Sequence, residues 1–262
     1  MHNNAQTSEL PALWHARLGH PGQPMLSKII KNSQGIPTKI CHISASTPCT
    51  ACSRGKLITR PTTSKLPSKI PKFLDIIHAD VCGPINPPSG PFRYFMVLID
   101  ASTKWSNVTL LSTRNMVMPR ILAQILRVKA QFPDHPIKTL RVDNAGEFTS
   151  KTFDDFCTSL GIDVQYPVPH VHFQNGLAEA VIKRLQLIAR PLLMQSKLPV
   201  STWGHAILQA NALIQYRPSA FNTYSPYQIA NGTKPDLSHL RSFGCQVMVP
   251  ITPPKRTKMG PQ

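Results

Sequence analysis

The sequence predicts an α/β protein in which a mixed five-stranded sheet flanked by helices follows a small helical module. The chain has 262 residues, enough for one domain with its own core and a smaller unit. Its middle part alternates apolar, β-branched runs with segments of helical period in the order βββαβαβα, which suits a mixed sheet covered by helices. Its first part instead places a histidine pair and a cysteine pair around a helical pattern.

The predicted module covers residues 1–52. Residues 24–35 have the apolar spacing of a short helix that ends at Gly35. Two histidines precede this helix and two cysteines follow it, at His15, His20, Cys49 and Cys52. Two imidazoles about one helical turn apart can face a common point, and a Cys-x-x-Cys turn can direct two thiolates to the same ion. The set suits tetrahedral Zn²⁺, and four protein ligands leave no position for water, which predicts one structural zinc ion.

The cysteines admit other interpretations. The spacing could be coincidental, or the Cys-x-x-Cys pair could be a redox pair. Cys41 and His42 are close in sequence, but adjacent residues rarely chelate one ion well, so neither is assigned as a ligand. All six cysteines are expected to be metal ligands or buried thiols rather than a disulfide framework, because the N-terminus lacks the features of a secretory signal.

Residues 53–72 are predicted to form a linker. They contain six basic residues, three prolines and no acidic residue, a composition that does not support a folded core. Such a segment can lie along phosphates, and Arg54 and Lys56 are its candidate nucleic-acid-binding residues.

The main domain, with trailing helices, is predicted over residues 73–235, and residues 236–262 form a C-terminal segment with a basic tail. Apolar runs bounded by Pro, Gly or Ser predict strands at residues 73–81, 94–100, 107–111, 137–143 and 162–168. Helical apolar spacing predicts helices at residues 116–132, 151–161, 176–195 and 203–217. Pro119 suits a helix start, Gly161 stops a helix, and Pro191 is expected to bend or interrupt the long helix.

The charge balance points to a polyanionic partner. The 29 Lys and Arg against 12 Asp and Glu give a formal net charge of +17. Nucleic acid is the first candidate, and a generally solvated basic surface or an anionic membrane are the alternatives. No apolar stretch approaches the roughly 18 residues of a membrane span, so we expect an intracellular protein without membrane contact.

The scarce acidic residues suggest a second metal site. Asp80 lies near the end of the first predicted strand, Asp143 at the end of the fourth, and Glu179 near the start of the long helix, with 35 residues between the last two. If the strands pair as predicted, these carboxylates converge, and carboxylate oxygens are ligands that Mg²⁺ prefers. Two ions about 3.5–4 Å apart would stabilise the attacking and leaving oxygens of an in-line phosphoryl transfer.

Position alone does not single out these acids. Asp75, Asp100 and Asp163 are equally associated with predicted strands, so all of them could simply cap strands and helices.

A polar stripe accompanies Glu179 along the predicted helix. Positions four, seven and eleven after it lie on its side of the helix, at Lys183, Gln186 and Arg190. This stripe could hold a DNA backbone, while Ile182, Leu185 and Ile188 supply apolar contacts elsewhere. An ordinary solvated helix face is the alternative.

The ordered motifs resemble those of copia-type retrotransposon integrases. They extend over most of residues 13–249 and read CTACSRGK, HADVCGPI, YFMVLID, RVDNAGEF, FCTSLGI, QNGLAE and RSFGCQV. The resemblance implies a pre-integrase His-His-Cys-Cys zinc module before an RNase H-like integrase core. It also implies that Asp80, Asp143 and Glu179 are the catalytic ligands of two Mg²⁺ or Mn²⁺ ions.

The resemblance further implies the reaction. Integrases of this family trim the 3′ ends of element DNA with water and then use the 3′ hydroxyls to attack target DNA. Element-end DNA and target DNA are therefore the expected partners. A homo-multimer is the expected active form, in the nucleus or in a cytoplasmic virus-like particle.

Several features depart from the family pattern. Ala145 replaces a glycine, Val142 a serine, and Ala180 a basic residue, although no triad ligand is lost. Capsid, protease and reverse-transcriptase regions and the long C-terminal part are not found, so the chain is expected to be a fragment of a decayed element. Two further functions stay open: a non-catalytic, zinc-containing module that only binds nucleic acid or protein, and an RNase H-like nuclease acting on RNA:DNA hybrids. The zinc module and the 35-residue spacing argue against the nuclease.

Overall fold

The computed structural model describes residues 4–37, 49–56, 71–143, 146, 148–166, 176–218 and 222–247. Several features singled out in the sequence lie outside these residues: Cys41, His42, Ala145, most of the linker at residues 57–70, and the tail from residue 248.

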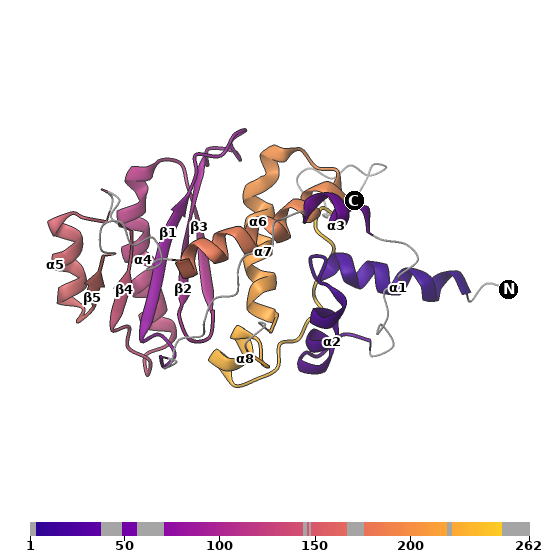
Figure 1. Ribbon diagram of the computed structural model, residues 1–262, viewed down its shortest axis with the longest axis horizontal. Coiled ribbons are helices and arrows are strands. Elements are labelled where there is room, and N and C mark those ends of the chain that lie inside the picture. Colours follow the sequence, from indigo (N-terminus) through magenta and orange to yellow (C-terminus); the bar gives the residue numbers. More distant parts are fainter. Residues whose placement is uncertain are drawn as a thin grey trace, which may run out of the picture.

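A five-stranded mixed sheet forms the centre of the fold, as predicted (Figure 1). Its strands are β1 (Ile76–Cys82), β2 (Tyr94–Asp100), β3 (Ser106–Leu111), β4 (Thr139–Arg141) and β5 (Asp163–Gln165). The order is β3-β2-β1-β4-β5, with antiparallel pairing from β3 to β1 and parallel pairing from β1 to β5. The last two strands are shorter than the apolar runs that predicted them. Because β1 and β4 are parallel, their carboxyl ends lie at the same edge of the sheet.

Both faces of the sheet are covered, which explains the nearly continuous apolar sequence of β2. Phe95, Val97 and Ile99 belong to one buried cluster, and Met96 and Leu98 belong to the other. Helices α6 (Gly176–Ser196) and α7 (Trp203–Tyr216) contribute to the first cluster. Helices α4 (Val117–Gln131) and α5 (Lys151–Ser159) contribute to the second. The short helical turns η1 (Arg114–Met116) and η3 (Val200–Thr202) precede α4 and α7.

Helix α6 runs from the sheet to the N-terminal module (Figure 1). The expected interruption at Pro191 is wrong, because the helix continues to Ser196. Packing on both sides of the proline holds the helical conformation: Ile188 and Leu192 are buried in the core, and Gly55 lies directly against the proline ring. A Cβ at position 55 would lie 3.0 Å from Pro191 Cγ, a tight contact that favours glycine here.

The N-terminal module contains helices α1 (Asn4–Arg17), α2 (Gln23–Asn32) and α3 (Thr50–Gly55). Only α2 was predicted. The start of the predicted linker, residues 53–55, belongs to α3. The module shares a core with the main domain, because four of its apolar side chains lie in the same cluster as α6 and α7: Trp14, Leu18, Leu26 and Ile29.

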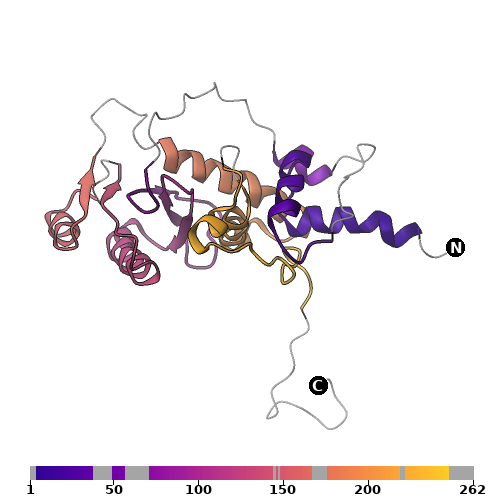
Figure 2. The same ribbon diagram turned by 90° about the horizontal axis from the view of Figure 1, so that it is seen from below.

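The C-terminal segment also packs into this region. After α8 (Pro226–Asn231), the chain pairs Asp236 with Gln34 in an isolated bridge. Leu237 and Leu240 then enter the cluster formed by the module, α6 and α7. Figure 2 shows this segment running close to the module. Among the described helices, none is long and apolar enough to cross a membrane.

Candidate functional site

Four side chains of the module form a compact tetrad: His15, His20, Cys49 and Cys52. One potential ligand atom of each lies within 4.8 Å of those of the others. His15 Nε2 is 3.2 Å from Cys52 Sγ, and His20 Nδ1 is 3.5 Å from Cys49 Sγ. Tetrahedral zinc with bonds of 2.0–2.3 Å would separate its ligand atoms by roughly 3.3–3.8 Å. The tetrad therefore fits a zinc ion after small side-chain adjustments.

The two histidines reach the tetrad by different routes. His15 lies in the last turn of α1, whereas His20 follows the end of that helix. The chain reverses through left-handed conformations at Gly19 (φ 67°) and His20 (φ 59°), and the His20 N–H donates to the His15 carbonyl at 2.7 Å. A Cβ at position 19 would come within 2.5 Å of Leu213 Cδ1, so this turn requires glycine.

The cysteines belong to the start of α3. Cys49 is its N-cap residue and Cys52 lies in its first turn, so the helix presents both sulfur atoms toward the histidines. Among the described cysteines outside the tetrad, Cys157 is buried and Cys82 is half-buried, but Cys245 is exposed, so the expectation of a buried thiol is wrong for Cys245.

Burial favours the uncharged forms of the tetrad side chains in the absence of a metal. It lowers the pKa of His15 to about 4 and that of His20 to about 3, so both imidazoles are neutral at physiological pH and can donate a lone pair. It raises the pKa of Cys52 to about 11. The Cys52 thiol therefore keeps its proton until a metal displaces it.

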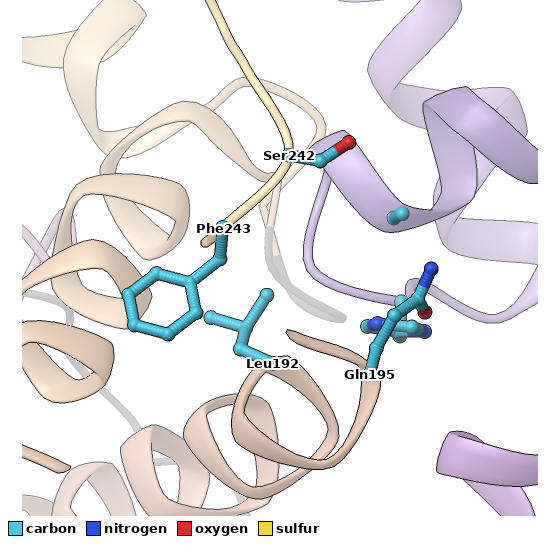
Figure 3. A pocket seen from close by; sticks show the side chains of 6 residues that line it. Leu192, Gln195, Ser242 and Phe243 are labelled. Carbon is cyan, nitrogen blue, oxygen red and sulfur yellow. The ribbon is translucent and has the colours of Figure 1, made fainter. Parts of the chain in front are cut away.

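A small pocket borders His20 where three parts of the chain meet (Figure 3). Leu192 and Gln195 come from α6, and Ser242 and Phe243 come from the C-terminal segment. Figure 3 shows Leu192 between Phe243 and Gln195. The tetrad is thus enclosed by the main domain on this side.

The predicted carboxylate site forms around Asp80. In the antiparallel register Asp80 is opposite Val97, whose side chain belongs to the cluster under α6 and α7. Directly opposed residues of neighbouring strands share a face of the sheet, so Asp80 faces the layer that contains α6.

Asp143 and Glu179 approach the same edge. The parallel register pairs His78 with Arg141, the last residue of β4, and Asp143 follows two residues later, close enough for its charge to raise the pKa of Asp80. Glu179 lies in the first turn of α6, a helix that contacts both β1 and β2. The structure therefore brings the three carboxylates to one edge of the sheet.

The electrostatics of Asp80 agree with this geometry. Burial and, to a smaller extent, the negative charges of Asp143 and Glu179 together raise its pKa to about 6, although the hydrogen bond from Val81 N–H (2.7 Å) and the charge of Arg114 oppose the increase. The carboxylates interact but are less tightly gathered than the tetrad, which is the one potential metal-ligand group of that compactness in the described residues. Negative charges that lie close together repel each other, and a bound cation would relieve this repulsion.

The competing acids lie at the opposite edge of the sheet. Asp75 precedes β1 and pairs with Lys138 at 2.8 Å, Asp100 is opposite Ile77, and Asp163 is opposite Thr139. Asp100 is buried and accepts three hydrogen bonds, from Leu74 N–H and from the N–H and hydroxyl of Thr103. The two sets of acids that the sequence could not separate are thus distinct in space.

Two predicted nucleic-acid-binding residues are engaged within the protein. Lys56 is half-buried and its Nζ donates to the His20 carbonyl. Gln186 is half-buried and its Nε2 donates to Cys82 Sγ at 3.5 Å. Arg54, Lys183 and Arg190 are exposed, as a nucleic-acid contact requires.

Sequence reasoning missed two basic residues beside these sites. Arg114, in η1 after β3, is close enough to Asp80 to lower the pKa of that carboxyl. Arg217, at the end of α7, is buried near the tetrad. In the sequence, Arg114 and Arg217 are simply basic residues at or just after the end of a predicted strand or helix. Such residues are too common to indicate a functional site.

The chain matches two domain families. Residues 2–57 match the GAG-pre-integrase domain and residues 72–171 match the integrase core domain. The expected resemblance to copia-type retrotransposon integrases is therefore confirmed.

The similar proteins are plant retrotransposon polyproteins. The chain is 32% identical over 263 residues to the retrovirus-related Pol polyprotein from transposon TNT 1-94 of Nicotiana tabacum, covering 98% of this chain and 19% of that protein. It is 28% identical to the corresponding Pol polyproteins from transposons RE2 and RE1 of Arabidopsis thaliana, covering 94% and 88% of this chain and 17% and 16% of those proteins. The chain thus spans less than a fifth of the relatives that it matches.

Proposed function

Because this chain carries a GAG-pre-integrase domain followed by an integrase core domain, we propose that it is the part of a retrotransposon integrase that performs 3′-end processing and strand transfer of element DNA into target DNA. The observation that carries the proposal is the convergence of Asp80, Asp143 and Glu179 at one edge of the sheet. The acids at the other edge have protein partners or lie apart from this group, and we assign them no part in the reaction.

The three carboxylates would hold two Mg²⁺ or Mn²⁺ ions, which supply Lewis-acid stabilisation to the attacking and leaving oxygens of phosphoryl transfer. Asp80 lies in β1 and Asp143 lies two residues after the end of the neighbouring parallel strand β4, so the sheet would hold both near the same edge. Glu179 is exposed at the start of α6 and closes the site from the helical layer. Burial of Asp80 favours its neutral form, so a bound cation would be needed to hold this carboxylate fully ionised.

DNA would approach along the exposed side of α6. Lys183 and Arg190 follow Glu179 on this helix and could neutralise backbone phosphates, while Arg54 extends the basic surface on α3. Element-end DNA and target DNA would both use this surface, and a homo-multimer would bring two element ends together.

The His-Cys tetrad would hold one structural Zn²⁺. Its four side chains provide a closed N₂S₂ set, and the neutral histidines are already in the form that binds metal. The ion would connect α1 to α3 and so stabilise the module.

A strand-transfer assay with matched variants tests the catalytic proposal. Purified chain with Mg²⁺ or Mn²⁺ should nick or join a labelled DNA duplex, and Asp143→Asn should lose this activity while keeping DNA binding. Asp163→Asn is the control, because it removes the same charge at the opposite edge of the sheet. DNA binding without turnover by the unmodified chain would instead identify a non-catalytic binding module, and cleavage confined to RNA:DNA hybrids would identify a nuclease.

A further inference from the structure

Two exposed arginines lie at the edge of the sheet that carries the three carboxylates. The carboxyl end of β1 is opposite the start of β2, and the start of β2 is opposite the end of β3. Residues that precede β2 or follow β3 therefore lie at the same edge as Asp80. Arg93 directly precedes β2, and Arg114 lies in η1 after β3.

The backbone of Arg93 is held from both sides. Its N–H donates to the Leu111 carbonyl at 3.0 Å, and its carbonyl accepts a hydrogen bond from Ile85 N–H at 2.7 Å. The pairing of β2 with β3 thus continues through Arg93. Because alternate residues of a strand share a face, Arg93 lies on the face of Phe95, which is also the face of Asp80.

The connection between β1 and β2, residues 83–93, is fixed on α7. Trp203 Nε1 donates to the Pro87 carbonyl at 3.0 Å, and Gly204 N–H donates to Ser89 Oγ at 3.2 Å. A Cβ at position 204 would lie 2.8 Å from that hydroxyl, so the connection packs closely on the start of α7. A connection that is already held in this way loses little further freedom when it binds a ligand.

Asn86 orients the side chain of Arg93. Its Oδ1 accepts a hydrogen bond from Arg93 Nη2 at 3.3 Å, and both residues are exposed. The amide N–H groups of Asn86 can donate to a ligand of the arginine. The other exposed residues of the connection are glycines and prolines, so its polar contacts with a ligand are concentrated at these two side chains. A guanidinium joined to an amide suits the oxygen atoms of a phosphate group.

We propose that Arg93 and Asn86, together with Arg114, form a second contact with the DNA backbone, on the β2–β3 side of the catalytic edge. The proposal rests on the DNA function proposed above and adds a surface separate from the polar stripe of α6. Strand geometry places the Arg93 backbone roughly 14 Å from that of Asp80, which is about four nucleotide steps along one strand of B-DNA. The bound phosphate would thus lie a few nucleotides from the one at the proposed metal site.

DNA binding by the full chain, measured without Mg²⁺ or Mn²⁺, tests the proposal independently of turnover. Arg93→Ala should lower the slope of log K against log salt by about 0.9 and weaken binding about eightfold at about 0.1 M salt, the effect of one lost phosphate contact. Adding Arg114→Ala should lower the slope by about twice as much. Fluorescence anisotropy of a labelled duplex over a series of salt concentrations provides both quantities.

Matched variants separate a positioned contact from general surface charge. Arg127→Ala removes the same charge from an exposed position of α4, which covers the other face of the sheet, and should change neither quantity. Arg93→Lys keeps the charge and should keep the slope. Asn86→Ala also keeps the charge but should weaken binding, by less than Arg93→Ala, because the guanidinium loses the acceptor that orients it.

The outcomes distinguish this inference from the function on which it rests. Equal binding by Arg93→Ala and Arg127→Ala would overturn the second contact, and a lower slope for Lys183→Ala in the same assay would show that the DNA function stands. Failure of the unmodified chain to bind DNA would overturn the proposed function itself. If Arg93→Ala lowers the Tm, Arg93→Gln provides the same comparison.

Two probes identify which DNA supplies the phosphate. One is a linear duplex, and the other has the same sequence closed by hairpins at both ends. Equal weakening of Arg93→Ala on both would support a contact with internal, target-like DNA. Weakening confined to the linear duplex would support a contact near a DNA end.

Discussion

The two edges of the sheet carry the same residue type in opposite environments. At the amino end of β1, Asp100 is buried with three hydrogen-bond donors and Asp75 has a lysine partner. At the carboxyl end, Asp80 is surrounded by two further carboxylates, which act with burial to raise its pKa. The first arrangement stabilises the fold, whereas the second destabilises it in the absence of a cation. This contrast supports the proposal that the carboxyl edge holds the catalytic metal ions.

The largest expected effect is on turnover. Asp80→Asn should lower the strand-transfer rate by at least about a hundredfold, the scale of losing one electrostatic element of a preorganised site. Asp75→Asn changes the same group at the other edge and should keep the activity. Rates measured on a labelled DNA duplex with Mg²⁺ check this, and equal losses in both variants would remove the functional distinction between the edges.

The next largest effect is on folding at the amino edge. Asp100→Ala should lower the free energy of unfolding by about 3 kcal/mol, because three donors around a buried carboxylate lose their acceptor. Asp163→Ala, at an exposed position of the same edge, should stay within about 0.5 kcal/mol of the unmodified chain. Urea denaturation provides both values, and an Asp100→Ala variant as stable as its control would refute the structural role.

Asp80→Asn should also raise the stability of the metal-free chain, by on the order of 1 kcal/mol at neutral pH. The folded-state pKa of Asp80 is raised to about 6 from an ordinary 3.8, so the folded chain binds more protons than the unfolded chain between these values. Stability from this group is therefore lost as pH rises through that interval. The advantage of the variant should vanish below pH 4 and be complete above pH 6 in thermal denaturation, and a constant advantage would rule out this titration.

The smallest effect concerns the ion pair at the amino edge. Lys138→Gln should lower the free energy of unfolding by about 0.2–1 kcal/mol, because the lysine is 60% exposed and solvent screens the pair. High salt should reduce the difference between the two chains in urea denaturation. A decrease in the free energy of unfolding above about 2 kcal/mol would show that the ion pair between Lys138 and Asp75 contributes more than an exposed pair can.

The fold and the carboxylate positions could be predicted because they depend on local pattern and topology. Apolar runs defined the strands, and the predicted helix between β3 and β4 allows the chain to cross the sheet and place β4 parallel to β1. The position of Asp80 and Asp143 at a common edge is then a matter of counting residues along two strands. Pro191 was misjudged because the packing of Gly55 against it depends on residues far away in sequence.

The grouping of His15, His20, Cys49 and Cys52 could be predicted from the residue types, but the geometry of the tetrad could not. His20 reaches the tetrad through two consecutive left-handed residues, a conformation that the spacing of the histidines does not specify. The internal hydrogen bonds of Lys56 and Gln186 could not be predicted either, because their partners, His20 and Cys82, lie far away in the sequence. Pattern alone treats such residues as solvated.

The shared apolar cluster of the module, α6 and α7 has a consequence for protein engineering. Trp14, Leu18, Leu26 and Ile29 cover side chains that a main domain expressed by itself would present to water. A soluble version of that domain needs polar replacements on α6 and α7. Chimaeric proteins made from related retrotransposons should exchange the module together with α6 and α7, because the side chains of the two parts pack against each other.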